Sequence, residues 1–455
     1  MPTIPSTKNL NAHGADILNA IRQTTSPYYQ AQVIAADQNN LGTLRQIGTT
    51  LINNDNLMNE FLTSLINRIG LVWVTSKLYT NPWAFMKKGL LELGETAEEI
   101  FVNLAQPRLY DAEEAETDVF KREIPDVDAV FHSLNYKIFY KQTIQNDSLR
   151  QAFLTWDGIT DLIARITNAM YSAVAYDEFL VMKYMVAMAI TNGDMWTETI
   201  PAQTDANMKS IVSTMKSISN LATFMSNKYN TAGVTTYTDK ADQYMIINSK
   251  FDAEMAVEVL ATSFNMDKAA LMGRVVLVDD FSTFDTPRIN KLIGGMANFT
   301  QLTAEQLQAL ANVPAVLVDK DWFMIFDQML KFTEIYNNQG LYWNYTLHTW
   351  KIFSYSPFAN AIAFTTTTQS VTAVTVTPST ATVNAGSELT LTASVTGTGF
   401  ITQAVTWSTN NSKVTINTMG KLTIPKGTTG SITVTATSKA DPTKSGTATI
   451  TIGGQ

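Results

Sequence analysis

One long stretch of helical pattern, from Asp147 to Asn192, constrains the fold more than any other part of the chain. Its apolar residues recur three and four positions apart, so they line one face of a helix of up to roughly seven turns. This stripe consists of Leu149, Phe153, Trp156, Ile159, Leu162, Ile163, Ile166, Met170 and Val174. From Asn168 onward polar residues become rare, so we expect that half to be buried on most sides. A change of pattern at 174–177 predicts a break into a second helix.

The rest of the first 364 residues mixes helix and strand patterns. Residues 54–70 predict an amphipathic helix that ends at Gly70, and residues 71–79 and 101–104 predict the two strands of a projecting hairpin. Residues 1–53, rich in Asn, Gln, Thr and Ala, predict an extended arm with one short helical patch. Further predicted elements are helices at 208–229 and 249–264, strands at 274–281 and 314–327, and a strand–turn–strand over 333–364. Helices combined with antiparallel hairpins indicate an α+β fold.

The composition changes abruptly at Thr365. Residues 365–372 have the composition of a linker, and Thr, Ser, Val and Gly dominate residues 373–455, where charged side chains are scarce. Short alternating segments, separated by Gly, Pro or Asn, recur along this tail. Regularly spaced short strands of this kind predict an all-β sandwich.

Composition excludes several functional classes. The chain of 455 residues carries a formal net charge of −8, so we do not expect it to bind the phosphate backbone of nucleic acid. It contains no cysteine, which rules out thiolate catalysis and zinc–thiolate sites. The N-terminal residues have neither the basic start nor the apolar run of a signal peptide, and no window is apolar enough for a membrane helix. We therefore expect synthesis and initial residence in the cytoplasm.

Acidic residues at two strand ends are the main candidates for chemistry. Asp279 and Asp280 follow one apolar run, and Asp319 and Asp321 follow another, as magnesium-binding carboxylates often do. No glycine-rich phosphate loop precedes either run, so surface turns are the better interpretation. The other candidates lack metal-binding spacing; they are the separate histidines His13, His132 and His348 and the acidic run Glu113, Glu114, Glu116 and Asp118.

Basic and aromatic clusters allow two interpretations each. Lys87 and Lys88 could contact nucleic acid, but in an acidic chain a contact with acidic residues of a neighbouring copy is favoured. The aromatic series at 342–355 could stack on sugars or bases, but in a strand it usually packs in a core. We predict no catalytic residue, no metal and no cofactor, and hence a structural building block rather than an enzyme.

Long strings of unusual composition carry a resemblance to a known family. They are FLTSLINRIGLV (61–72), YDAEEAE (110–116), IQNDSLRQAF (144–153), VLVDKDWFMIFD (316–327), GLYWNY (340–345) and FANAIAF (358–364). In this order they resemble the major capsid proteins of phi29-like small tailed podophages, which have the Hong Kong 97 (HK-97) fold. The tail is similar to a bacterial immunoglobulin-like group 2 domain through Val374, Val376, Pro378, Gly386, Leu391, Val405, Trp407, Ser408, Gly420, Leu422, Val434 and Ala436.

The resemblance implies a division of the chain. Residues 1–364 would form the HK-97-like capsid domain, and residues 373–455, after the linker 365–372, would form the immunoglobulin-like domain. The capsid domain would comprise an N-arm at 1–53, an extended loop at 71–106 lying over a neighbouring subunit, a peripheral domain at 130–192 and 317–364 around the spine helix, and an axial domain at 193–316.

The implied function is self-assembly. The chain would form pentamers and hexamers of an icosahedral or prolate head shell, enclosing double-stranded DNA without sequence-specific binding. Its other partners would be a scaffolding protein and a portal protein, with no membrane involved, and the shell would be assembled in the bacterial cytoplasm and remain in the virion. We predict inter-subunit contacts at Trp83, Phe85, Lys87 and Lys88. Some relatives of the fold form a lysine–asparagine crosslink, but we expect non-covalent assembly here.

Two other functions compete with this one. An adhesin or glycan-binding protein could use the immunoglobulin-like module, but it should also show a signal peptide and repeated modules. A metal-dependent enzyme could use the aspartates at the two strand ends, although no substrate is suggested.

Overall fold

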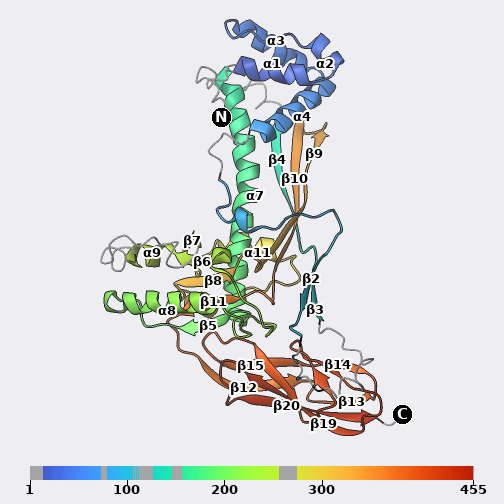
Figure 1. The fold of residues 1–455 in the computed structure, drawn as a ribbon. Coiled ribbons are helices and arrows are strands. Elements are labelled where there is room, and N and C mark those ends of the chain that lie inside the picture. Colours follow the sequence, from blue (N-terminus) through green and yellow to red (C-terminus); the bar gives the residue numbers. More distant parts are fainter. Residues whose placement is uncertain are drawn as a thin grey trace. The chain divides into compact units, whose positions relative to one another are not determined.

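The computed structural model describes residues 14–72, 79–105, 107, 109, 111, 127–145, 156–255 and 274–453 (Figure 1). At residues 62, 65–72, 145 and 156–168 only the backbone is described. The chain folds into two compact units, each assembled from three separate stretches. The first unit comprises residues 1–85, 137–179 and 329–350, and the second comprises 86–136, 180–328 and 351–455.

Most of residues 14–53 are helical, so the prediction of an extended arm is wrong for them. They form α1 (Gly14–Thr24), α2 (Pro27–Gln32) and α3 (Leu41–Ile52). The start of α2 is encoded locally, because the Ser26 hydroxyl accepts a hydrogen bond from the Tyr29 N–H at 3.2 Å and Pro27 needs no partner in the first turn. The numerous polar residues lower the average hydrophobicity, but they fall on the outer faces of these helices.

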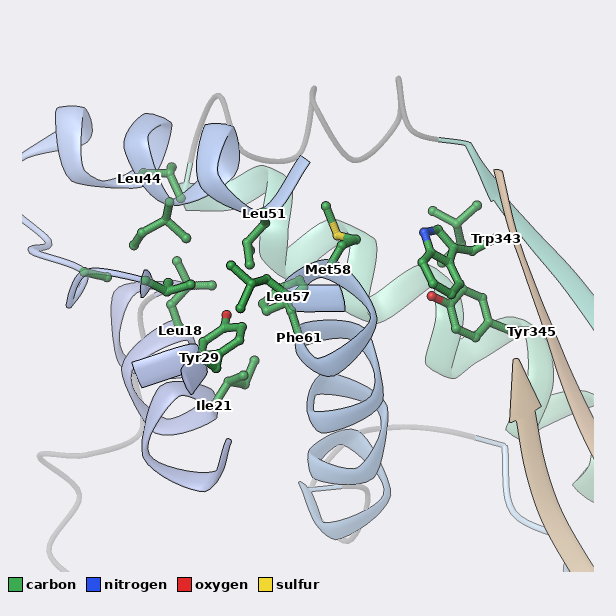
Figure 2. Close-up of a cluster of buried hydrophobic side chains, with 14 of the residues drawn as sticks. Leu18, Ile21, Tyr29, Leu44, Leu51, Leu57, Met58, Phe61, Trp343 and Tyr345 are labelled. Carbon is green, nitrogen blue, oxygen red and sulfur yellow. The ribbon is translucent and has the colours of Figure 1, made fainter. Parts of the chain in front are cut away.

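The inner faces of the helices form one core with α4 (Asp55–Val72) and strand β10 (Tyr342–Tyr355) (Figure 2). Tyr345 is fully buried in it and stacks on Phe332 with ring centroids 5.5 Å apart. Its fully buried members from the arm and α4 include Ile21, Tyr29, Leu44, Ile47, Leu51, Leu57 and Phe61. The aromatic series at 342–355 therefore contributes to the core, as its favoured interpretation predicted.

The predicted hairpin is different in detail. Helix α4 continues to Val72, past the predicted stop at Gly70, so residues 71 and 72 are not in a strand. Residues 73–78 lie outside the described residues. The predicted returning strand at 101–104 corresponds to β2 (Ala97–Val102), and its partner is β3 (Val127–His132).

The long helix is α7, which runs from Trp156 to Asn192 over 37 residues. The predicted break at 174–177 is wrong, because the helix continues through it. Asp177, within this stretch, is buried and accepts a hydrogen bond from the Tyr140 hydroxyl at 2.6 Å. Every residue from 180 to 190 is buried, as the loss of polar residues predicted. The predicted start at Asp147 lies outside the described residues.

The second unit contains a five-stranded mixed sheet in the order β5–β11–β8–β6–β7. The strands are β5 (Trp196–Thr199), β6 (Gln243–Asn248), β7 (Arg274–Val278), β8 (Ala315–Asp319) and β11 (Ala361–Thr365). Helices α8 (Met208–Leu221) and α9 (Ser249–Met255) share a core with this sheet. Two more helices, α11 (Thr286–Ile293) and α12 (Ala304–Leu310), lie between β7 and β8 in the chain, and a Thr303–Gln306 capping box starts α12.

A second sheet has the order β1–β9–β10–β4, with β1 (Gly89–Leu90), β4 (Tyr136–Gln145) and β9 (Phe323–Asn337). The predicted strand and turn at 333–340 are confirmed by β9 and the turn after it. The single aromatic strand predicted from there to 364 is instead two strands, β10 and β11, because the chain leaves strand conformation at 356–360. The single strand predicted at 314–327 is instead two strands, β8 and β9, because the chain turns at 320–322.

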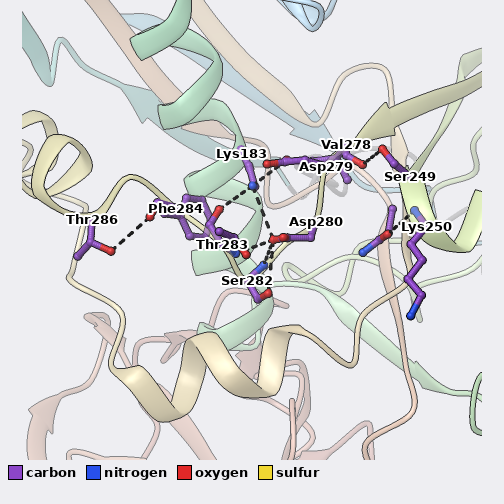
Figure 3. Close-up of polar contacts among 11 residues, drawn as sticks. Lys183, Ser249, Lys250, Val278, Asp279, Asp280, Ser282, Thr283, Phe284 and Thr286 are labelled. Atoms are coloured by element: carbon purple, nitrogen blue, oxygen red, sulfur yellow. Dashed lines mark hydrogen bonds and ion pairs between the residues drawn. The ribbon is translucent and has the colours of Figure 1, made fainter.

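Lys183 on α7 is a buried cation within the second unit (Figure 3). Its Nζ lies 2.7 Å from Asp279 Oδ1 and 3.8 Å from Asp280 Oδ1, and it donates to the Thr283 carbonyl at 2.7 Å. Burial would raise the pKa of Asp280, but hydrogen bonds from Thr283, the Lys183 ammonium and the Ser282 N–H together hold that pKa below its usual value. The two aspartates thus tie the segment after β7 to the helix.

The C-terminal tail is a β-sandwich, as predicted. Its strands are β12 (Ser370–Thr377), β13 (Thr380–Asn384), β14 (Glu388–Thr390), β15 (Thr392–Thr398), β16 (Val405–Thr409), β17 (Thr415–Ile416), β18 (Lys421–Thr423), β19 (Gly430–Ser438) and β20 (Ser445–Gly453). They pair as β12–β15, β13–β20–β19–β16 and β14–β18–β17 around one core. Since β11 ends at Thr365 and β12 begins at Ser370, the connection between them is shorter than the predicted linker.

The sandwich contacts the rest of the second unit closely. The Gln403 N–H donates to the Gly193 carbonyl at 2.9 Å, and Lys439 Nζ donates to the Asn227 carbonyl. Gly193 has φ +78, and a Cβ there would lie 2.1 Å from the Ile401 carbonyl oxygen, so this approach requires glycine. Burial lowers the pKa of Lys439 from 10.5 to about 8.

We expect the Lys183 cluster to respond asymmetrically to substitution. The double change Asp279→Asn/Asp280→Asn leaves an ammonium buried without a counter-ion and should lower the free energy of unfolding by about 3 kcal/mol. Lys183→Met removes the buried charge, keeps most of the volume and leaves partly exposed carboxylates, so its cost should stay below about 1 kcal/mol. Urea unfolding of the unassembled chain measures both, with Lys250→Met, on an exposed lysine, as control. A larger loss for Lys183→Met would contradict this assignment.

Lys439 predicts a pH dependence of stability. Between pH 8 and pH 10.5 the folded chain has released this proton while the unfolded chain still holds it, so folding stability should rise with pH across this window. Lys439→Met should abolish that rise. The check is the urea midpoint at pH 7.5 and 9.5, taken as the difference between wild type and variant so that other titrating groups cancel. Parallel profiles would show that Lys439 is not buried by the sandwich contact.

Candidate assembly surface

The antiparallel pair β2–β3, called the hairpin from here on in place of the predicted one, has two faces of opposite character. Its register joins Ala97 to His132 and Val102 to Val127, so alternate residues of both strands share a face. The inner face carries Glu99, Phe101, Asp128, Val130 and His132, which are all buried or half-buried. The outer face carries Glu98, Ile100, Val102, Val127, Ala129 and Phe131, which are all exposed.

The inner face is anchored by polar and aromatic contacts within its own unit. His132 is buried, with Nδ1 2.7 Å from Ser354 Oγ and Nε2 3.2 Å from Glu99 Oε2. The other Glu99 oxygen accepts the Ser356 hydroxyl at 2.5 Å. Phe101 stacks on Phe358 with ring centroids 5.5 Å apart. A two-stranded ribbon is marginal alone, so these contacts hold the pair in place.

The outer face is unusually apolar for an exposed surface. Phe131 is 64% exposed, Ile100 and Val102 are each 58% exposed, and Val127 is 47% exposed. Leu104, next along the chain, is 56% exposed. Isolated exposed apolar residues are common, but a contiguous group on one face indicates a surface that another protein covers. Strand alternation alone does not predict this face, because the sequence pattern pairs the β2 segment with residues 71–79 rather than with β3.

The four predicted contact residues have different environments. Trp83 is fully buried, with its ring 5.3 Å from Phe179 in an edge-on arrangement, so packing within the chain explains it. Phe85 is 40% exposed. Lys87 and Lys88 lie directly before β1 in the chain. The Lys88 N–H donates to the Ile325 carbonyl at 2.9 Å. The structure gives each lysine an acidic partner in its own chain.

Asp327 is the centre of the lysine cluster. Lys87 Nζ lies 2.6 Å from Asp327 Oδ2, and Lys351 Nζ contacts the other carboxylate oxygen. Burial would raise the pKa of Asp327, but the ammonium groups of Lys351 and Lys87 outweigh it and hold that pKa below its usual value. Lys88 pairs with Asp321. Because one carboxylate pairs with two ammonium groups, this cluster contributes to the packing of the chain itself.

The aspartates at the two strand ends are engaged in ion pairs and hydrogen bonds within the chain. Asp279 and Asp280 are paired with Lys183, and Asp321 is paired with Lys88. Burial raises the pKa of Asp319, opposed by hydrogen bonds from Thr238 and from the Asp321 N–H. Within the described parts of the chain, no group of three or more histidine, aspartate or glutamate side chains is placed to hold a metal ion. His13 and the acidic run at 113–118 lie outside those parts.

None of the described helices is both long enough and apolar enough to span a bilayer.

Comparisons with known proteins agree with this architecture. A family model described as "Phi29-like phage major capsid protein" matches residues 18–365, and a "Bacterial Ig-like domain (group 2)" model matches residues 370–449. The major capsid protein of Bacillus phage B103 is 37% identical over 434 residues, covering 93% of this chain and 89% of that protein. The major capsid protein of Bacillus phage PZA is 34% identical over 398 residues, covering 86% and 82%.

Among solved structures, the capsid structure of Staphylococcus phage Andhra aligns with a TM-score of 0.51 at 15% identity, covering 65% of this chain and 86% of that one. This likeness concerns the fold, and it confirms the predicted α+β, HK-97-like class with an added all-β domain. The match over residues 18–365 and the two curated relatives establish the family. The chain therefore belongs to the phi29-like phage major capsid protein family, and it carries a C-terminal immunoglobulin-like domain.

Proposed function

We propose that copies of this chain assemble through pentamers and hexamers into an icosahedral or prolate head shell around packaged double-stranded DNA. The observation that carries the proposal is the exposed apolar outer face of β2–β3 in a chain of this family. Such a face is costly to leave in water, at roughly 25 cal/mol per Å² of apolar surface. A neighbouring subunit that covers it would recover this free energy, and residues 71–106 would then act as the extended loop.

Anchoring of the inner face would favour this interaction. The contacts of Glu99, Phe101 and His132 hold the pair before any neighbour binds. Association of a pre-organised surface loses less conformational entropy than ordering of a free loop. A shell shares its stability among many such interfaces, so each can be modest.

The remaining partners follow from charge and from the family. A subunit with net charge −8 suits a container that encloses DNA without gripping it or reading its sequence. We propose a scaffolding protein and a portal protein as assembly partners, with assembly in the bacterial cytoplasm and no membrane involvement. We also propose that the subunit has no enzymatic activity and that assembly is non-covalent. No contact described above favours the adhesin alternative, which depends on the presence of the sandwich alone.

The outer face gives a direct test. Ile100→Asp and Phe131→Asp place a carboxylate in the proposed interface, where burial would desolvate it, so shells should be lost while the subunit stays folded. Negative-stain microscopy with the scaffolding partner measures assembly, and circular dichroism measures folding. Thr396→Asp, on an exposed position of β15, is the matched control and should still assemble. Normal shells from both hairpin variants would exclude this face from the interface.

Trp83 and Phe85 should separate folding from assembly. Trp83→Ala removes a fully buried ring and should lower the free energy of unfolding by about 3–5 kcal/mol. Phe85→Ala alters a partly exposed ring, for which we propose a neighbour contact, so it should change the free energy of unfolding by less than about 0.5 kcal/mol while reducing shell yield. Urea unfolding and shell counts measure the two effects. Full shell yield from Phe85→Ala would remove this residue from the proposed contacts.

A further inference from the structure

A buried carboxylate joins the hairpin to the sandwich. Asp128, on the inner face of β3, is only 4% exposed. Its Oδ1 accepts a hydrogen bond from Asn417 Nδ2 at 2.9 Å, and its Oδ2 accepts from the Thr418 hydroxyl at 3.1 Å. Asn103 Nδ2, from the segment after β2, also donates to Oδ2 at 3.1 Å. Three donors therefore replace the water that the carboxylate loses on burial.

Hydrogen bonds within the sandwich fix the turn that carries the two donors. Asn417 and Thr418 lie between β17 and β18, and Asn417 Oδ1 accepts the Lys421 N–H at 2.8 Å. Gly420 closes the turn at φ +79, where a Cβ would lie 2.2 Å from the Leu391 carbonyl oxygen. Because this oxygen of Asn417 is occupied, its amide group is oriented with Nδ2 toward Asp128.

Asp128 and His132 lie near opposite ends of β3. His132 anchors one end of the inner face through Ser354, and Asp128 lies four residues away, roughly 13 Å along β3. Asp128 is paired with Phe101, near the end at which β2 finishes and β3 begins. Phe101, which is paired with Asp128, stacks on Phe358 at this same end, so the hydrogen bonds to Asp128 add a directional constraint, set by the sandwich, to a ribbon that packing already holds.

We propose that the immunoglobulin-like domain is an intramolecular clamp, which binds Asp128 through Asn417 and Thr418 and sets the orientation of β2–β3 for assembly. This inference rests on the proposed function, in which the outer face of β2–β3 contacts a neighbouring subunit. In this role the sandwich would influence how neighbouring subunits are oriented in the shell. Hydrogen bonds to a buried charged group contribute more than neutral ones, so the clamp is stronger than a typical surface contact.

A reversal of donor and acceptor tests the clamp in the full-length chain. Asn417→Asp keeps the oxygen that accepts the Lys421 N–H but sets a second carboxylate against Asp128. Asp128→Asn replaces one of the two acceptor oxygens by an NH2 group. The amide therefore cannot accept hydrogen bonds from all three donors. The double variant Asp128→Asn/Asn417→Asp restores a donor–acceptor pair with reversed roles. Asn411→Ala/Thr443→Ala, in other turns of the sandwich, is the matched control.

Hydrogen exchange of the unassembled chain is the first readout. Peptides covering 97–102 and 127–132 should exchange at least about tenfold faster in each single variant, and they should recover in the double variant. Peptides covering 432–436, in the sandwich core, should stay protected in every variant, which separates loss of the clamp from unfolding of the domain. Unchanged exchange of the hairpin in both single variants would overturn the clamp.

Shell uniformity is the second readout. Each single variant should give shells of more variable size and lower yield than wild type, with recovery in the double variant. Uniform shells from both single variants would overturn the proposed role in assembly. If the wild-type chain forms no shells under any assembly condition, the proposed function fails instead, and the exchange measurement still decides whether the clamp exists.

Discussion

Complete burial of α7 between residues 180 and 190 is the constraint on which the second unit depends. A helix enclosed on all sides must have every polar side chain paired, because an unpaired buried charge costs several kcal/mol. Lys183 meets this requirement through Asp279, Asp280 and the Thr283 carbonyl. The aspartates that could have suggested a metal site are thus counter-ions of a buried helix, and their positions after β7 serve the packing of that helix.

The β2–β3 pair shows the opposite arrangement. Only its inner face is covered, by aromatic stacking of Phe101 and by the hydrogen bonds of His132 and Glu99. Its outer face leaves large apolar side chains in water. The buried Lys183 charge is paired within the chain, whereas these apolar side chains are left exposed, and we propose that another copy covers them. Family membership and the physical chemistry of the face support the same function independently.

The immunoglobulin-like domain is tied to the capsid domain at several points rather than suspended from a long linker. The Gly193–Gln403 and Asn227–Lys439 contacts hold it against the sheet-bearing part of the unit, and Asp128 joins it to the hairpin. These contacts come from three separate regions of the sequence. Together they connect the added domain to the surface that we propose for assembly.

The sequence by itself determined the elements whose signals are local. The helical conformation and later burial of α7, the turn between β9 and β10 and the regular short strands of the sandwich were all predictable, because periodicity and turn residues act over a few positions. It also carried the family resemblance in its long strings. The prediction of an extended arm is wrong for α1 and α3, because the polar residues on their outer faces make their apolar stripes inconspicuous in the sequence.

Only the tertiary structure decided which distant residues meet. The pairing of β2 with β3, the burial of Trp83 and the contact of Asp128 with Asn417 join residues that nothing in their neighbourhoods connects. Asp177 illustrates the same limit, because the Tyr140 hydroxyl that donates to this buried carboxylate lies on another element of the fold. Local sequence sets the conformational preference of a segment. The cost of burying its polar groups is decided by partners that only the folded chain supplies.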